Sequence, residues 1–210
     1  MNTRQLLLVV IAASLGVGLL SIGVIQTSNS QVAQQSSPVI KAYFTSQLQG
    51  DCGAPGAFIN PVCVILDLMK SARKRVLIAM YESKKTENDP LGNQLRMDLL
   101  DAVKNLSVPV YVLLGNDNSL NSSSDEKVSE YLGKQVICTS TIHQRKSEER
   151  VGMHHKFIVI DDQIVITGSL NWNGSSIENN TENIIVIESA QLAWEFAEEF
   201  RRIWGCASFE

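Results

Sequence analysis

Continuous runs of apolar residues alternate along this chain with segments whose apolar residues recur every three or four positions. The first pattern predicts strands and the second predicts amphipathic helices. Strands are expected at residues 39–44, 75–81, 108–114, 135–138 and 183–187, and in two runs that flank Asp161 and Asp162. Helices are expected at residues 61–72, 90–106, 125–132 and about 190–204. This alternation predicts an α/β layered domain, a mixed β-sheet flanked by helices.

Three residues refine these boundaries. Asn60 is expected to cap the first helix, and Pro90 suits the first turn of the second. Pro109 lacks a backbone N–H, so we expect the strand around it to start near an edge of the sheet.

The most informative segment is the predicted hairpin MHHKFIVIDDQIVITGSLNWN, residues 153–173. Because side chains of a strand alternate between its faces, His154 and Lys156 should point the same way and His155 the other way. A tight turn at Asp161 and Asp162 separates the two strands. A nucleophile, a cation, a hydroxyl and an amide then meet at one end of a sheet, and that set suits a tetrahedral, anionic phosphate.

The spacing His154-x-Lys156-x4-Asp161, followed by Gly168-Ser169-x-Asn171, resembles the HxKxxxxD/GSxN signature of the phospholipase D superfamily. The resemblance covers roughly residues 38–205 and agrees with the α/β layered fold. The chain carries one such motif, as in the short branch of bacterial Nuc-type endonucleases and mitochondrial cardiolipin hydrolases.

The resemblance implies roles for four residues of the hairpin. His154 would be the nucleophile, Lys156 and Asn171 would bind the phosphate, and Ser169 would assist them. Each has a simpler alternative, because a strand histidine is often a hydrogen-bonded core residue, and serine and asparagine are common at turns. Lys156 favours the functional interpretation, since a lysine on an inward face needs an anion.

Two carboxylates complete the implied catalytic set. Glu182, in the segment NNTEN, would accept a hydrogen bond from the far ring nitrogen of His154 and fix its tautomer, although a solvated loop residue is the alternative. Asp161 belongs to the motif, but its place in a turn suggests support of the loop more than chemistry. No metal or other cofactor is expected, because His155 diverges from His154 and lysines can neutralise the phosphate.

The predicted reaction is phosphodiester hydrolysis through a phosphohistidine intermediate. It needs a nucleophile and a separate acid, so one motif per chain predicts a homodimer with a shared active site. The motif does not separate nucleic acid from phospholipid. The small single-motif architecture favours a nuclease, a membrane segment would favour a phospholipase D or cardiolipin hydrolase, and a catalytically silent polyanion-binding protein is a third possibility. The net charge of −4 provides no general attraction for nucleic acid.

The N-terminus predicts contact with a membrane. Residues 6–25 form an uncharged apolar stretch long enough to span a bilayer, and Arg4 precedes it. We therefore expect an anchor or signal segment at residues 1–26, a flexible linker at residues 27–37 and a catalytic domain at residues 38–210. Cleavage of the segment stays open. The catalytic domain would lie outside the cytosol, in the periplasm or the extracellular space if the source is bacterial.

Four cysteines suit that compartment. Cys52 and Cys63 flank a Gly/Pro-rich insertion and could form a disulfide, with two free thiols as the alternative. Cys138 lies in an apolar run and is expected in the core. The absence of a CxxC pair argues against a zinc site.

Overall fold

The computed structural model describes residues 37–47, 52, 60–116, 127–133, 136–139, 143–144, 150–151 and 153–204. The predicted membrane segment and nearly all of the predicted linker lie outside these residues. No helix within the described ranges is both long enough and apolar enough to cross a membrane.

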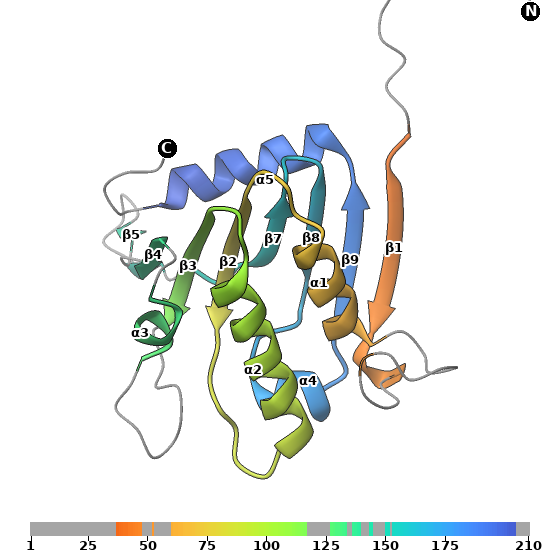
Figure 1. Ribbon diagram of the computed structural model, residues 1–210, viewed down its shortest axis with the longest axis vertical. Coiled ribbons are helices and arrows are strands. Elements are labelled where there is room, and N and C mark those ends of the chain that lie inside the picture. The colour runs from red at the N-terminus through yellow and green to blue at the C-terminus, as the bar shows by residue number, and fades with distance from the viewer. Residues whose placement is uncertain are drawn as a thin grey trace, which may run out of the picture. The chain divides into compact units, whose positions relative to one another are not determined.

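The domain is built on a seven-stranded mixed sheet in the order β1-β9-β8-β7-β2-β3-β4 (Figure 1). Neighbours from β1 through β9, β8 and β7 to β2 run antiparallel, whereas the β2–β3 and β3–β4 pairs are parallel. The strands are β1 (Val39–Phe44), β2 (Val76–Glu82), β3 (Val110–Asn116), β4 (Val136–Thr139), β7 (Lys156–Ile160), β8 (Ile164–Gly168) and β9 (Asn183–Glu188). This confirms the α/β fold with a mixed sheet.

Helices cover both faces of the sheet, α1 and α2 on one face and α5 on the other (Figure 1). The helices are α1 (Pro61–Lys70), α2 (Pro90–Asn105), α3 (Val128–Leu132), α4 (Gly174–Glu178) and α5 (Ala190–Ile203). Asn60 caps α1 as expected, because its side chain accepts a hydrogen bond from the Val62 N–H at 2.8 Å.

Three features differ from the expectations. The strand after Pro109 is internal, since β3 lies between β2 and β4; it starts at Val110, so the proline stands just outside the ladder. The short helix α4 was not predicted, because its sequence GSSIE has no apolar periodicity. A small ladder of β5 (His143–Gln144) and β6 (Arg150–Val151) was missed as well.

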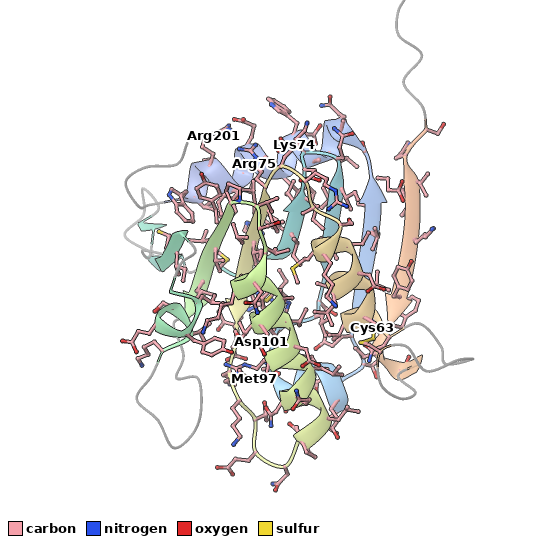
Figure 2. All side chains as sticks on the ribbon, viewed as in Figure 1. Cys63, Lys74, Arg75, Met97, Asp101 and Arg201 are labelled. Carbon is pink, nitrogen blue, oxygen red and sulfur yellow. A yellow bond between two sulfur atoms is a disulfide. The ribbon has the colours of Figure 1, made fainter. Side chains whose placement is uncertain are left out.

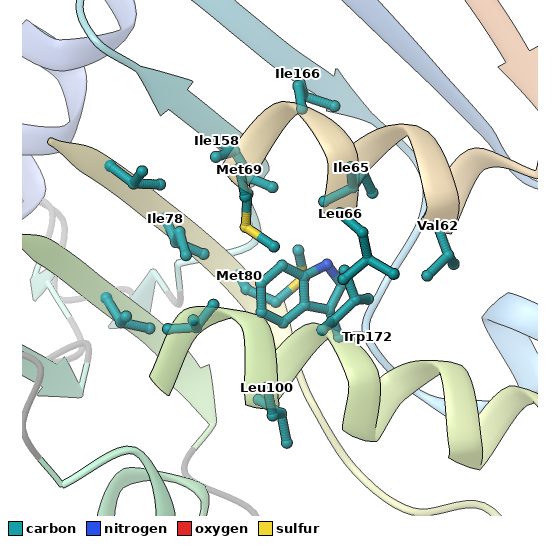
Figure 3. Packing of buried hydrophobic residues seen from close by; sticks show 14 of the residues in the cluster. Val62, Ile65, Leu66, Met69, Ile78, Met80, Leu100, Ile158, Ile166 and Trp172 are labelled. Carbon is teal, nitrogen blue, oxygen red and sulfur yellow. The ribbon is translucent and has the colours of Figure 1, made fainter. Parts of the chain in front are cut away.

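Two apolar clusters hold the layers together, and the alternation of β2 divides its side chains between them. Ile78 and Met80 face the cluster under α1 and α2, while Leu77 and Ala79 face the cluster under α5. Trp172 belongs to the first cluster, and Figure 3 shows its ring beside Met80 and Leu66. The segment that follows β8 is therefore fixed by the main core.

Cys52 and Cys63 form the expected disulfide, which ties the segment before α1 to the first turn of that helix. Cys138 lies in the core under α5, as expected, and is disulfide-bonded too. The prediction of a flanking-cysteine bridge is confirmed.

Candidate active site

The chemically informative residues gather where four neighbouring strands begin or end. β2 ends at Glu82 and β8 ends at Gly168, while β7 begins at Lys156 and β9 begins at Asn183. The antiparallel pairing of β2 with β7, β7 with β8 and β8 with β9 puts all four positions at the same end of the sheet. This is the end at which α4 lies (Figure 1).

His154 and Lys156 are in direct contact there. The Lys156 Nζ lies 3.1 Å from the His154 Nδ1 and donates to the His154 carbonyl oxygen at 3.0 Å. An ammonium can only donate, so Nδ1 is the acceptor in this arrangement. This geometry corresponds to the tautomer of a neutral imidazole that carries its proton on Nε2.

Lys156 is a half-buried cation that makes no salt bridge within the described part of the chain. Burial lowers the pKa of its ammonium below the ordinary value, although the charges of Glu182 and Glu82 raise it and offset part of that effect. A bound anion would compensate the charge that the fold leaves without a direct partner.

Ser169 and Asn171 follow β8 on the same end of the sheet. The Ser169 hydroxyl accepts hydrogen bonds from the backbone N–H of Asn183 at 3.1 Å and from its side-chain amide at 3.4 Å. Asn171 has a buried carboxamide oxygen that finds no hydrogen-bond partner among the residues the structure describes. The N–H of the next residue, Trp172, donates to the Glu82 carbonyl at 3.0 Å, which fixes this corner to the end of β2.

Glu182 lies just before β9 and is held by a residue that the sequence did not single out. The Thr45 hydroxyl accepts from the Glu182 N–H at 2.7 Å and donates to the Asn180 carbonyl at 2.6 Å, while the Thr45 N–H donates to the Glu182 carbonyl at 3.0 Å. The Glu182 carboxylate accepts from Ser176 at 3.2 Å and Asn180 at 3.3 Å. The expected hydrogen bond to His154 is not among its contacts, because the His154 ring turns its Nδ1 toward Lys156 instead.

His155 faces the opposite side of the sheet, as alternation predicts. Its Nε2 lies 3.1 Å from the Glu199 carboxylate of α5, and its ring packs edge-on against Phe157. Burial would raise the pKa of Glu199, but hydrogen bonds from Arg202 and His155 outweigh burial and lower it. His155 thus links the motif strand to α5 and stays apart from His154.

Asp161 lies at the other end of β7, about 16 Å along the strand from Lys156 at roughly 3.3 Å per residue. Its carboxylate accepts the backbone N–H groups of Arg73, Lys74 and Arg75 at 2.8, 2.7 and 3.1 Å. Lys74 and Arg75 appear at the top of Figure 2, at the opposite end of the sheet from α4. The catalytic set implied by the resemblance includes Asp161, but the structure places its carboxylate on the turn at residues 73–75 and away from His154 and Lys156.

Two residues at the end of β2 complete the site and were missed by sequence reasoning. The Tyr81 ring packs on the His154 imidazole with 4.0 Å between centroids, and the Lys156 Nζ lies 5.1 Å from its centroid. Glu82 accepts a hydrogen bond from the Asn173 amide at 2.6 Å and pairs with Lys84 at 2.9 Å. The available signal for Glu82 was its place directly after the apolar run at residues 75–81, whereas no local pattern indicated Tyr81. Across the described ranges, no group of three or more His, Cys, Asp or Glu side chains could hold a metal ion.

Comparison with known families identifies the domain. Residues 65–204 match the family described as "Cardiolipin synthase, PLD-like domain". The match includes His154, Lys156, Asp161, Asn171 and Glu182.

Curated relatives share parts of the sequence. The mitochondrial cardiolipin hydrolase of Mus musculus is 44% identical over 63 residues, which cover 30% of this chain and 28% of that protein. That of Chlamydomonas reinhardtii is 27% identical over 139 residues, which cover 66% of this chain and 55% of that protein. The matches thus span just over a quarter of the first relative and just over half of the second.

Two solved structures share the fold. NucT from Helicobacter pylori aligns with a TM-score of 0.59 at 20% identity, over 80% of this chain and 96% of that one. Nuc from Salmonella typhimurium, described as a phospholipase D family member, aligns with a TM-score of 0.52 at 19% identity, over 80% of this chain and 95% of that one. At these identities the likeness establishes the fold alone.

Proposed function

Because the chain belongs to the phospholipase D superfamily through its PLD-like domain, we propose that it hydrolyses phosphodiester bonds with His154 as the nucleophile. One observation carries the proposal. The half-buried ammonium of Lys156 lies 3.1 Å from the His154 ring and, among the described residues, has no salt-bridge partner. A phosphodiester supplies both the anion for Lys156 and the electrophilic phosphorus for His154.

In the first step the His154 Nε2 attacks phosphorus and the bond to the leaving alcohol breaks. Before it attacks, Nε2 must lose its proton. When a phosphate binds, it would draw the Lys156 ammonium away from Nδ1, and Nδ1 could then carry the ring proton in place of Nε2. Glu182 would then accept from Nδ1–H and stabilise the imidazolium charge, the orienting role that catalytic histidines need. Lys156, Ser169 and Asn171 would hold the phosphoryl oxygens.

The leaving alkoxide needs a proton, and the hydrolysis of the phosphohistidine needs a base for the attacking water. His155 faces α5 and His143 stands eleven residues before the motif, so neither is a suitable partner. We assign both tasks to His154 of the partner subunit in a two-fold homodimer, with one active site per dimer.

Two substrate classes contain this bond. The small single-motif architecture favours nucleic acid. The 44% identity to a protein named for cardiolipin, together with the apolar stretch at residues 6–25, favours a phospholipid. The net charge of −4 gives no general preference for a polynucleotide.

A substrate panel tests the function and separates the two classes. Purified full-length protein is assayed on a chromogenic phosphodiester, single-stranded DNA, RNA and cardiolipin vesicles, with and without EDTA, beside His154→Ala. We expect wild-type turnover of the chromogenic ester and of one natural class, unaffected by EDTA. Binding of these polyanions without turnover of any of them would establish a binding protein and overturn the enzyme proposal.

Mixing chains tests the shared site. When wild-type protein is refolded with a large excess of His154→Ala chains, heterodimers hold only one of the two histidines, and activity should fall well below the amount expected from the wild-type chains alone. Light scattering of the same samples reports the oligomeric state. A fully active monomer would contradict the homodimer.

We also propose that residues 1–26 attach the domain to a membrane, with residues 27–37 as the linker and the domain outside the cytosol. The uncharged residues 6–25 and the disulfide between Cys52 and Cys63 support this placement. Carbonate extraction and protease accessibility in intact cells test it, because an anchored, exported domain pellets with membranes and is cleaved from outside. N-terminal sequencing decides whether the segment is removed.

A further inference from the structure

We propose that Tyr81 is a positioning residue for the reaction, whose ring sets the orientation of the nucleophilic imidazole and of the phosphate-binding ammonium. This inference rests on the proposed function and deepens it. Tyr81 lies outside the HxKxxxxD/GSxN pattern, 73 residues before His154 (154 − 81), and no feature of the motif indicates it.

The geometry begins with the backbone. The Tyr81 N–H donates to the His155 carbonyl at 2.8 Å, which extends the β2–β7 ladder by one bond beyond the pairing of Met80 with Lys156. This bond fixes the Cα of Tyr81 beside the residue that separates His154 from Lys156. The ring therefore reaches both of them from a rigid strand end.

The ring then limits the freedom of His154. The two ring centroids are 4.0 Å apart and the planes are tilted by 36°, so the imidazole lies over the face of Tyr81. His154 is an exposed residue, and within the described chain its ring has only Tyr81 and the Lys156 Nζ as partners. Without the aromatic surface, an exposed imidazole would turn about both side-chain torsions. With it, Nδ1 is held on the Lys156 side of the ring, and Nε2 is the ring nitrogen that has no contact among the described residues.

The same ring holds the ammonium. The Lys156 Nζ lies 5.1 Å from the Tyr81 centroid, within the range of a cation–π contact. An aromatic face attracts the cation without neutralising it, whereas a carboxylate would compete with the phosphate. The Tyr81 hydroxyl makes no hydrogen bond within the described part of the chain, so the ring and not the hydroxyl should carry the effect.

The test compares Tyr81→Phe, which keeps the ring, with Tyr81→Leu, which removes it. Tyr111→Leu is a matched control, because Tyr111 packs edge-on against Trp204 on the α5 side, away from the site. On the substrate that wild-type protein turns over, Tyr81→Phe should stay within about twofold of wild type. Tyr81→Leu should lose about 10- to 100-fold in kcat with little change in KM, since misplacing a reacting group affects mainly the chemical step. Tyr111→Leu should lower the melting temperature and leave kcat unchanged.

A spectroscopic readout separates this inference from the proposed function. The ring current of Tyr81 should shift the His154 ring protons in wild type and in Tyr81→Phe, and the shift should vanish in Tyr81→Leu while the His155 signals stay in place. Wild-type protein without any phosphodiesterase activity would defeat the proposed function but leave this shift to be measured.

Two results would overturn the inference. One is Tyr81→Leu with wild-type kcat, and the other is equal loss in Tyr81→Phe and Tyr81→Leu. If Tyr81→Leu is unfolded by circular dichroism, Tyr81→Met replaces it as a longer apolar side chain, and the same comparison with Tyr81→Phe decides.

Discussion

The two ends of the β7–β8 hairpin carry two parts of one sequence motif, but they differ in whether their polar side chains have hydrogen-bond or ion-pair partners. At the turn, the Asp161 carboxylate receives three backbone N–H groups, and the neighbouring Asp162 pairs with Arg75 at 2.8 Å. At the other end, Lys156 has no salt bridge among the described residues and the Asn171 carboxamide oxygen is buried without a partner.

This difference separates a structural role from a chemical one within a single motif. A half-buried cation without an ion-pair partner costs free energy, so a fold keeps a group such as Lys156 where an anionic ligand will complete it. A phosphodiester supplies only acceptors, so it completes the Lys156 ammonium and not the Asn171 oxygen. Among the described residues, both carboxylates of the turn have partners, and as anions they would repel a phosphate. On this contrast rests our proposal that the histidine and lysine of the motif serve the reaction and that its aspartate supports the loop.

The strongest test compares the adjacent histidines, which differ only in the face they occupy. His154→Ala should lower kcat by at least about a thousandfold, because it removes a covalent step, while thermal unfolding changes little. His155→Ala should keep most of the activity and lose some stability with its contact to Glu199. Turnover assays and melting curves of both variants provide the measurement.

Equal losses of activity in the two variants would mean that the faces of the strand do not separate chemistry from structure. An active His154→Ala protein would remove the nucleophile assignment altogether.

The second test addresses the turn. Asp161→Ala should destabilise the domain by about 2 kcal/mol, since three N–H groups lose a charged acceptor and alanine is poorly suited to the positive φ of 54°. Activity per folded molecule should stay near wild type. Urea unfolding and turnover at a temperature well below the melting point measure the two effects.

The pH dependence of the free energy of unfolding makes the test of Asp161 more specific. Burial would raise the pKa of Asp161, but hydrogen bonds from the N–H groups of Lys74, Arg73 and Arg75 and the charge of Lys74 outweigh it, so the pKa lies below its ordinary value. A depressed folded-state pKa stabilises the fold above the ordinary aspartate pKa of about 3.9, and this stabilisation is lost as pH falls through the lowered value. Asp161→Asn should therefore differ most from wild type at neutral pH and converge with it in acid. A constant difference down to the lowest pH would contradict this assignment.

The contrast between the hairpin ends also explains what the sequence could predict. Alternation on a strand placed His154 and Lys156 on one face and His155 on the other, because this depends only on neighbouring positions. Strand and helix order followed from apolar periodicity in the same way. The supporting role of Asp161 was suggested by its turn, although the identity of its donors, residues 73–75, was not.

Contacts between distant segments could not be predicted. Thr45 contacts Glu182 because β1 pairs with β9, and Tyr81 contacts His154 because β2 pairs with β7. No local sequence pattern predicts this order of strands. The His154 ring also turned toward Lys156 instead of Glu182. Ring orientation depends on several competing neighbours, so motif spacing alone did not determine it.

The third test uses one of these distant contacts, at the reactive end. Thr45→Val removes the hydroxyl that joins β1 to the Glu182 N–H and the Asn180 carbonyl. Because Thr45 is buried and valine has nearly its shape, the change should mainly loosen the backbone of Glu182. We expect a loss of about threefold in kcat, with Thr45→Ser close to wild type, in steady-state assays. If serine and valine variants lose activity equally, the hydroxyl is not what positions Glu182.

The smallest expected effect concerns the ion pair at the turn. Arg75 donates to Asp162 from both Nε and Nη2, at 3.1 and 2.8 Å, but the two side chains are 25% and 39% exposed, so water screens their attraction. Asp162→Asn keeps an acceptor and tolerates the positive φ of 58° at this position, and it removes only the charge. The free energy of unfolding should fall by less than about 1 kcal/mol, the difference should shrink in 1 M salt, and kcat should not change. The decisive comparison is between the losses of unfolding free energy in Asp162→Asn and in Asp161→Ala. A larger loss in Asp162→Asn would mean that the surface ion pair, and not the capped backbone, stabilises the turn of the hairpin.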